Sequence, residues 1–135
     1  MLNKITLNLD FINKTKNSIN NDIFHAQGVK LLKKYHLTGN FYVNLTLIGK
    51  TKMKSLNNEF LHKNYPTDVL SFPILTKTEL ANSKNHEIPI LLGEIVVCYE
   101  VAKKQALDKK LRTDDEIIFL FLHGLKHLLG HHHKE

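Results

Sequence analysis

Apolar and polar residues follow two different periods along the chain, and these periods predict its strands and helices. Period-two alternation or a short continuous apolar run predicts four strands, at residues 5–11, 41–48, 68–72 and 91–98. Apolar residues at helical spacing predict helices at residues 21–35, 53–61 and 99–110. The polar segment 76–88 has no apolar period and is expected to form an exposed loop. Because strands and helices alternate, we expect one sheet packed by helices.

The last predicted helix has the clearest boundaries in the chain. Thr113 and Glu116 match a capping box, in which each side chain binds a backbone N–H at the start of the helix. Residues 116–129 are apolar almost all round, so we expect this helix to be buried. Gly130 supplies the left-handed residue at which many helices end.

Two histidines on this helix, His123 and His127, are spaced four residues apart. This spacing is about one turn, so both imidazoles project from one face. The turn at Gly130 allows His133 to approach the same point. Three nitrogens with one open coordination position are typical of a catalytic zinc site, and one ion per chain is expected. Such a histidine pair is also compatible with simple core packing.

The remaining histidines of the C-terminal run have a different predicted role. His131 and His132 adjoin His133, and neighbouring side chains cannot all converge on one ion. One of them is expected to support the ligands or to face a substrate. Gly124 occupies the position that carries the general base in zinc proteases of the H-E-x-x-H type. The sequence therefore disfavours peptide hydrolysis and favours a close backbone approach at Gly124.

Composition narrows the classes of protein and of partner. The 135 residues suit a single domain, which we expect to cover residues 1–135. The formal net charge of +6 favours a polyanionic partner, and lysine supplies almost all of the positive charge. Cys98 alone cannot form an internal disulfide, and we expect it to be a buried thiol on a strand. With no leader pattern and no apolar run long enough to cross a bilayer, we expect a cytoplasmic protein without a membrane partner.

Three motifs, in order along the chain, are similar to those of the YbeY family of bacterial endoribonucleases. Residues 123–133 resemble the H-G-x-x-H-L-x-G-x-D-H signature, and residues 66–73, after Leu56-Asn57, resemble the P-T-D-V-L-S-F-P block. Residues 92–97 resemble the L-G-D-I-V-I strand. The resemblance implies a zincin-like α+β fold with a mixed four-stranded sheet. It also implies zinc bound by His123, His127 and His133.

The same resemblance implies a function and a set of partners. The family cleaves single-stranded RNA in small-subunit rRNA maturation and in ribosome quality control. Single-stranded RNA, rRNA and the small ribosomal subunit with its proteins are therefore the expected partners. Three residues, Thr67, Asp68 and Ser71, are expected along the substrate cleft, although strand termination and hydrogen bonding are alternative roles for them.

The chain departs from the family pattern at positions that bear on catalysis. Leu61 aligns with an arginine that the resemblance places at the scissile phosphate, so His62 or Lys63 is expected to make that contact instead. His132 replaces an aspartate, and Glu94 replaces another, with a structural and a catalytic role both open for Glu94. Two other functions remain: a metal-dependent hydrolase of another substrate, and a ribosome-associated binding protein with reduced activity.

Overall fold

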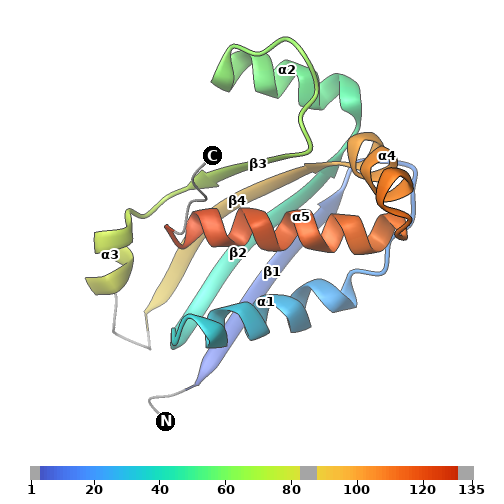
Figure 1. Cartoon of the computed structure of the whole chain (residues 1–135). Coiled ribbons are helices and arrows are strands. Elements are labelled where there is room, and N and C mark those ends of the chain that lie inside the picture. The colour runs from blue at the N-terminus through green and yellow to red at the C-terminus, as the bar shows by residue number, and fades with distance from the viewer. Residues whose placement is uncertain (1–3, 83–87, 131–135) are drawn as a thin grey trace.

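Four strands form one mixed sheet in the part of the chain that the computed structural model describes, residues 4–82 and 88–130 (Figure 1). The strands are β1 (Ile5–Asn13), β2 (Gly39–Ile48), β3 (Val69–Pro73) and β4 (Pro89–Cys98). Their spatial order is β1-β2-β4-β3. The first three strands in this order are parallel, and β3 pairs antiparallel with β4. The predicted α+β fold with a mixed four-stranded sheet is therefore confirmed, with β4 in the interior and β3 at an edge.

Within the same described residues, five helices accompany these strands, and they lie on both faces of the sheet. They are α1 (Asp22–Lys34), α2 (Lys50–Leu61), α3 (Lys77–Asn82), α4 (Tyr99–Lys109) and α5 (Thr113–Leu128). Helices α1 and α5 lie in front of the sheet in the view of Figure 1. The main core lies beneath them, where Phe24 of α1 meets Phe121 of α5 at 5.4 Å between ring centroids. A smaller core on the other face joins Met53 of α2 to Leu70 and Val96.

The predicted strands and the predicted helices before residue 111 are confirmed, with ends that shift by a few residues. The prediction of an exposed loop at 76–88 is wrong in its first half, because α3 forms there. Thr76 and Glu79 form a capping box: each backbone N–H donates to the other residue's side-chain oxygen, at 2.9 and 3.1 Å. These hydrogen bonds hold the pKa of Glu79 below its usual value. Leu80 is buried and attaches this short helix to the core.

The capping box predicted at Thr113 and Glu116 is wrong. Helix α5 begins at Thr113 itself, Arg112 is its N-cap, and none of the described side chains caps it. The carboxylate of Glu116 is buried and accepts from Nζ of Lys109 at 3.0 Å through both oxygens. Since Lys109 lies at the end of α4, this ion pair joins the two helices. The expectation that α5 is buried all round also fails at Phe119, which is 54% exposed.

Several helices end at a residue with left-handed backbone. Gly130 has φ of 84°, which confirms the predicted turn after α5. At the ends of α1, α2 and α4 the left-handed residues are not glycines: His36, His62 and Lys110 have φ of 57° or 58°. Left-handed backbone is strained for residues that carry a Cβ. The neighbouring structure must therefore maintain the left-handed backbone at these three helix ends.

Cys98 lies at the end of β4 and is fully buried, as predicted for a structural thiol. Burial raises the pKa of this thiol above its usual value, and the nearby carboxylate of Glu100 acts in the same direction. Over residues 4–82 and 88–130, none of the helices has the length and apolar character that crossing a bilayer requires.

Candidate metal centre and adjoining groove

Helix α5 brings His123 and His127 together above the sheet. Their ring centroids are 4.7 Å apart and the rings are tilted by 45°. Gly124 lies between them and lets the helix approach β4, since a Cβ added there would lie 2.8 Å from Cγ2 of Ile95. The close approach expected at Gly124 is thus confirmed. This close approach sets the distance between both imidazoles and the sheet.

The donor chemistry of this pair fits a zinc ion. Neutral imidazole nitrogen is a common zinc ligand, and the Nε2 atom of His127 is buried, where a polar nitrogen favours a ligand over an apolar contact. The described residues contain no group of three histidine, cysteine or carboxylate side chains arranged for a metal. The third predicted ligand, His133, lies outside the described residues, as do His131 and His132. The described chain therefore supplies two members of the predicted ligand set.

Strand β3 runs beside the histidine helix and carries Ser71. Directly opposed residues of antiparallel strands point to the same face, and Ser71 is paired with Ile95. Because Ile95 contacts α5 at Gly124, Ser71 lies on the face of β3 that is turned toward the histidine pair. Glu94 and its partner Phe72 lie on the opposite face. The Glu94 side chain is therefore turned away from the histidine pair, which favours its structural role over a catalytic one.

Asp68, just before β3, is held by structural hydrogen bonds. One carboxylate oxygen accepts from the backbone N–H of Val69 at 2.7 Å and contacts the Thr67 hydroxyl at 3.4 Å. The other oxygen accepts from the side-chain amide of Gln105 in α4 at 3.2 Å. This network ties the start of β3 to α4. The predicted substrate contact at Thr67 and Asp68 thus competes with a structural role.

The phosphate-contact candidates lie at the C-terminal end of α2. His62 and Lys63 are both exposed, and Leu61 before them is 50% exposed. The loop that follows is held by the buried Asn57, whose side-chain amide donates to the carbonyl of Tyr65 at 2.8 Å. The backbone N–H of Lys63 also donates to the Asn57 carbonyl. Asn57 therefore shapes the segment that presents these candidates, a role the sequence did not reveal.

Edge strand β3 separates the two groups of predicted site residues. Helix α2 packs on the face of β3 that carries Leu70 and Phe72, whereas α5 packs on the other face. A ligand that touches both His62 and His123 must therefore pass around the outer edge of β3. The structure places Ser71 on the same face of the sheet as the histidine pair but leaves His62 and Lys63 on the other side of the strand.

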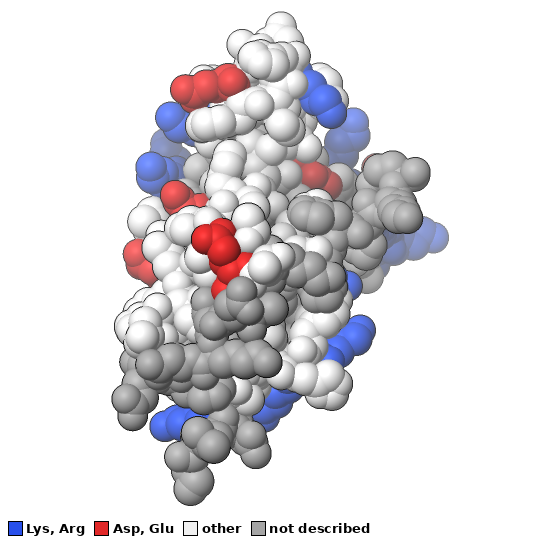
Figure 2. All heavy atoms as spheres, turned by 90° about the vertical axis from the view of Figure 1, so that its left-hand side faces the viewer, with Lys and Arg blue, Asp and Glu red and all other residues white. Residues whose placement is uncertain are grey.

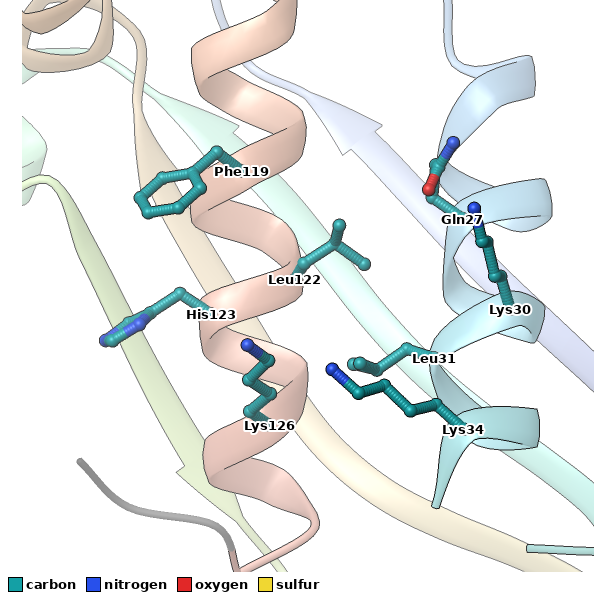
Figure 3. Close-up of a pocket in the computed structure, with 8 residues that line it drawn as sticks. All are labelled: Gln27, Lys30, Leu31, Lys34, Phe119, Leu122, His123 and Lys126. Carbon is teal, nitrogen blue, oxygen red and sulfur yellow. The ribbon is translucent and has the colours of Figure 1, made fainter. Parts of the chain in front are cut away.

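A groove between α1 and α5 adjoins the histidine pair, and only a weak signal in the sequence points to it (Figure 3). Its volume is about 560 Å³. The lining consists of Gln27, Lys30, Leu31, Lys34, Phe119, Leu122, His123 and Lys126. The sequence signal is the spacing of Lys30 and Lys34, four residues apart on α1. This spacing alone does not predict a groove, because the groove forms only where α1 packs beside α5.

Among the described residues, positive side chains do not form one large patch at the end of the molecule where α5 finishes. Figure 2 shows Lys and Arg side chains around the outline of this face and a few acidic side chains nearer its middle. The net charge therefore does not show where a polyanion binds. The local arrangement of lysines, as in the groove, is more informative.

Comparison with known proteins shows that the chain matches one protein family. The sequence model of the family described as Endoribonuclease YbeY matches residues 8–135. The chain is 36% identical over 91 residues to an Endoribonuclease YbeY from Wigglesworthia glossinidia brevipalpis, covering 67% of this chain and 55% of that protein. A relative of the same name from Francisella philomiragia is 31% identical over 129 residues, covering 95% of this chain and 79% of the relative. The chain spans about half the length of several curated relatives that it matches.

A solved structure shares the fold. The solution structure of TM1509 from Thermotoga maritima superposes with a TM-score of 0.62 at 25% sequence identity. The superposition covers 93% of this chain and 75% of that one. Sheet and helices are therefore arranged alike in the two proteins.

Proposed function

The chain belongs to the YbeY endoribonuclease family, and from this membership we propose that it is a zinc-dependent endoribonuclease that cleaves single-stranded RNA. We further propose that it acts in the cytoplasm, in small-subunit rRNA maturation and ribosome quality control, with the small ribosomal subunit and its proteins as partners. The observation that carries the proposal is the histidine pair on α5, with ring centroids 4.7 Å apart. Gly130, with φ of 84°, ends the helix three residues before His133 in the sequence.

Zinc held by His123, His127 and His133 would supply a Lewis acid for a phosphate oxygen and a water of lowered pKa. The chain's own residues have separate tasks in this proposal. Ser71, on the α5 face of β3, is suited to hydrogen-bond an RNA phosphate or ribose. His62 or Lys63 neutralises a neighbouring phosphate from beyond the edge of β3, and Thr67 and Asp68 orient the strand between them.

A nuclease assay with matched variants tests this proposal. Purified full chain without an affinity tag is assayed on a labelled single-stranded RNA and on the same RNA annealed to its complement. Cleavage should require zinc or a similar divalent ion, favour the single strand and be lost in His123→Ala and His127→Ala. His25→Ala, an exposed histidine on α1, is the control and should retain activity. Equal cleavage by His123→Ala and the control would refute the site.

Leu61 favours a second candidate function, RNA binding with reduced catalysis. Leu61 replaces the family arginine, so the chain lacks a charge that the resemblance places at the scissile phosphate. The alternative is a ribosome-associated binding protein with reduced catalytic activity. Metal-dependent turnover on single-stranded RNA separates the two functions, since the alternative predicts RNA binding with little or no cleavage. A metal-dependent hydrolase of another substrate would cleave a non-RNA ester instead.

A further inference from the structure

We propose that the lysine groove, defined by Lys30 and Lys34 of α1, Lys126 of α5 and the apolar surface between them, binds the part of a single-stranded RNA that flanks the cleavage point. The inference rests on the proposed function, because it extends the same site. It names a second surface for RNA, on the opposite side of α5 from β3.

Charge is the first support for an anionic occupant. Among the residues that the structure describes, the lining contains three lysines and no carboxylate. Within residues 4–82 and 88–130, none of the three is paired with a carboxylate. Figure 3 shows Lys34 extending from α1 into the space between the helices, whereas the side chain of Lys126 lies over α5. Three lysine charges that face one groove without neutralisation are suited to successive phosphates, which recur at regular spacing along a nucleic-acid strand.

The floor of the lysine groove is the second support, because it suits bases. Leu31 and Leu122 form an apolar surface between the lysines, and the ring of Phe119 is 54% exposed at one end. Lys109 lies 4.6 Å from the centroid of this ring. Single-strand binders combine a basic groove with aromatic rings on which bases stack. A paired duplex has its bases turned inward, so this combination favours a single strand.

Continuity with the histidine pair is the third support. His123 lines the lysine groove and also belongs to the pair on α5. An RNA segment in the groove therefore reaches the proposed metal centre without leaving the surface of α5. The volume of about 560 Å³ lies within the range of small-ligand pockets, so the groove holds a short segment rather than a helix.

Two matched triple variants test the groove. In the first, Lys30→Gln, Lys34→Gln and Lys126→Gln remove the lysines of the groove. In the second, Lys52→Gln, Lys103→Gln and Lys104→Gln remove the same charge from exposed positions on α2 and α4. Binding of labelled oligouridine to the full chain is followed by fluorescence anisotropy at several salt concentrations. The groove variant should bind at least about tenfold more weakly than the control, and its salt slope should fall by about 0.7 for each phosphate that is no longer neutralised.

Phe119 provides a separate measurement. Phe119→Ala should weaken oligouridine binding about tenfold with little change in salt slope, because stacking releases no counterions. Phe119→Tyr should retain binding, since it keeps the ring. Because the ring also lies beside Lys109, thermal melting of both variants shows whether either substitution changes the stability of the fold.

The outcomes separate the groove from the nuclease. Equal RNA affinity in the groove and control triple variants, with wild-type cleavage intact, overturns the groove and leaves the proposed function standing. A wild-type chain that binds through the groove without cleaving supports the groove and overturns the nuclease. Absence of binding and cleavage in the wild type overturns both. Displacement of the RNA by polyglutamate at equal charge concentration would assign the groove to an acidic protein segment and overturn the RNA proposal.

Discussion

Leu61 stands where the resemblance to the family implies an arginine, and its surroundings make this difference testable. The side chain is 50% exposed at the last position of α2, and its neighbour Phe60 packs instead against Phe72, at 5.1 Å between ring centroids. Leu61 is therefore not a core residue. An arginine can replace it with little loss of packing.

The Leu61→Arg variant should keep the wild-type melting temperature and gain RNA turnover. A donor that stabilises charge in the transition state typically contributes about a hundredfold to a thousandfold in rate. The gain should appear in kcat more than in RNA affinity, because only interactions that strengthen in the transition state accelerate the reaction. Single-turnover cleavage beside thermal melting measures both. A stable variant without faster cleavage would mean that His62 or Lys63 already fills the role.

Asn57 should contribute more to stability than any other polar residue of α2. Its side-chain amide is fully buried and donates to the Tyr65 carbonyl, while its own Oδ1 has no hydrogen-bond partner among the described residues. Asn57→Ala should lower the free energy of unfolding by about 1–3 kcal/mol, because the Tyr65 carbonyl loses its donor. Urea unfolding measures this change. The adjacent Asn58→Ala, at an exposed position, is the control and should change stability by less than about 0.5 kcal/mol.

The two Thr-x-x-Glu segments show that a capping-box motif does not by itself predict where a capping box forms. The capping box predicted at Thr113 does not form, while one does form at Thr76, in a segment predicted to be a loop. The same four-residue pattern occurs at both places, so the pattern cannot choose between them. Tertiary contacts decide, because Lys109 binds Glu116 and removes it from the helix start.

At the scale of elements, the position of α5 depends on Gly124. Gly124→Ala should destabilise the chain by about 1–3 kcal/mol, because the added Cβ meets Ile95 at 2.8 Å and the core must repack. The same change should also disturb the histidine pair. Chemical unfolding and zinc titration measure the two effects.

A double-mutant cycle with Ile95→Ala isolates the cause. In that background the Cγ atoms of Ile95 are absent, so Gly124→Ala should stabilise by up to about 1 kcal/mol through helix propensity. An unchanged penalty in the Ile95→Ala background would show that the close approach is not the reason for the glycine.

The apolar pattern located every strand of the described chain and four of its five helices. Most of these elements bury one regular face, whereas the end of β4 is a continuous apolar run that is buried on both faces. The apolar pattern failed where burial is local. Helix α3 has six residues and attaches through Leu80, which is too little apolar surface to set a period. Phe119 was expected inside because its neighbours on α5 are apolar, yet its ring lies against Lys109 at the surface. The histidine pair was predictable from spacing alone, since both members belong to one helix.

At the scale of the whole molecule, zinc should act as a stabilising ligand. Adding zinc at about a hundred times its dissociation constant should raise the free energy of unfolding by about 2.7 kcal/mol, because the folded chain alone holds the histidines together. Melting curves with zinc, with a chelator and after re-addition measure this shift. His123→Ala should show no shift, whereas His25→Ala should respond like the wild type. A zinc response that survives in His123→Ala would place the ion elsewhere.

The parts of the site that sequence could not predict join elements distant along the chain. The lysine groove needs α1 beside α5, and the separation of His62 from His123 depends on β3 being the edge strand. Neither relation follows from spacing, because both are set by the order of strands and the packing of helices. Spacing and the family motifs predicted the metal ligands, whereas the folded sheet determines which other residues lie on the same side as His123 and His127.

The left-handed residues that end α1 and α4 have a consequence for adaptation to heat. His36 and Lys110 hold a backbone shape that disfavours any side chain by about 1–2 kcal/mol, and neither belongs to the proposed site. The melting temperature of the protein can therefore be raised by substitution at these two surface positions. His36→Gly and Lys110→Gly should each raise the melting temperature, although glycine's greater freedom in the unfolded chain offsets part of the gain. Heat resistance can therefore be raised at these positions without changing the histidine pair on α5.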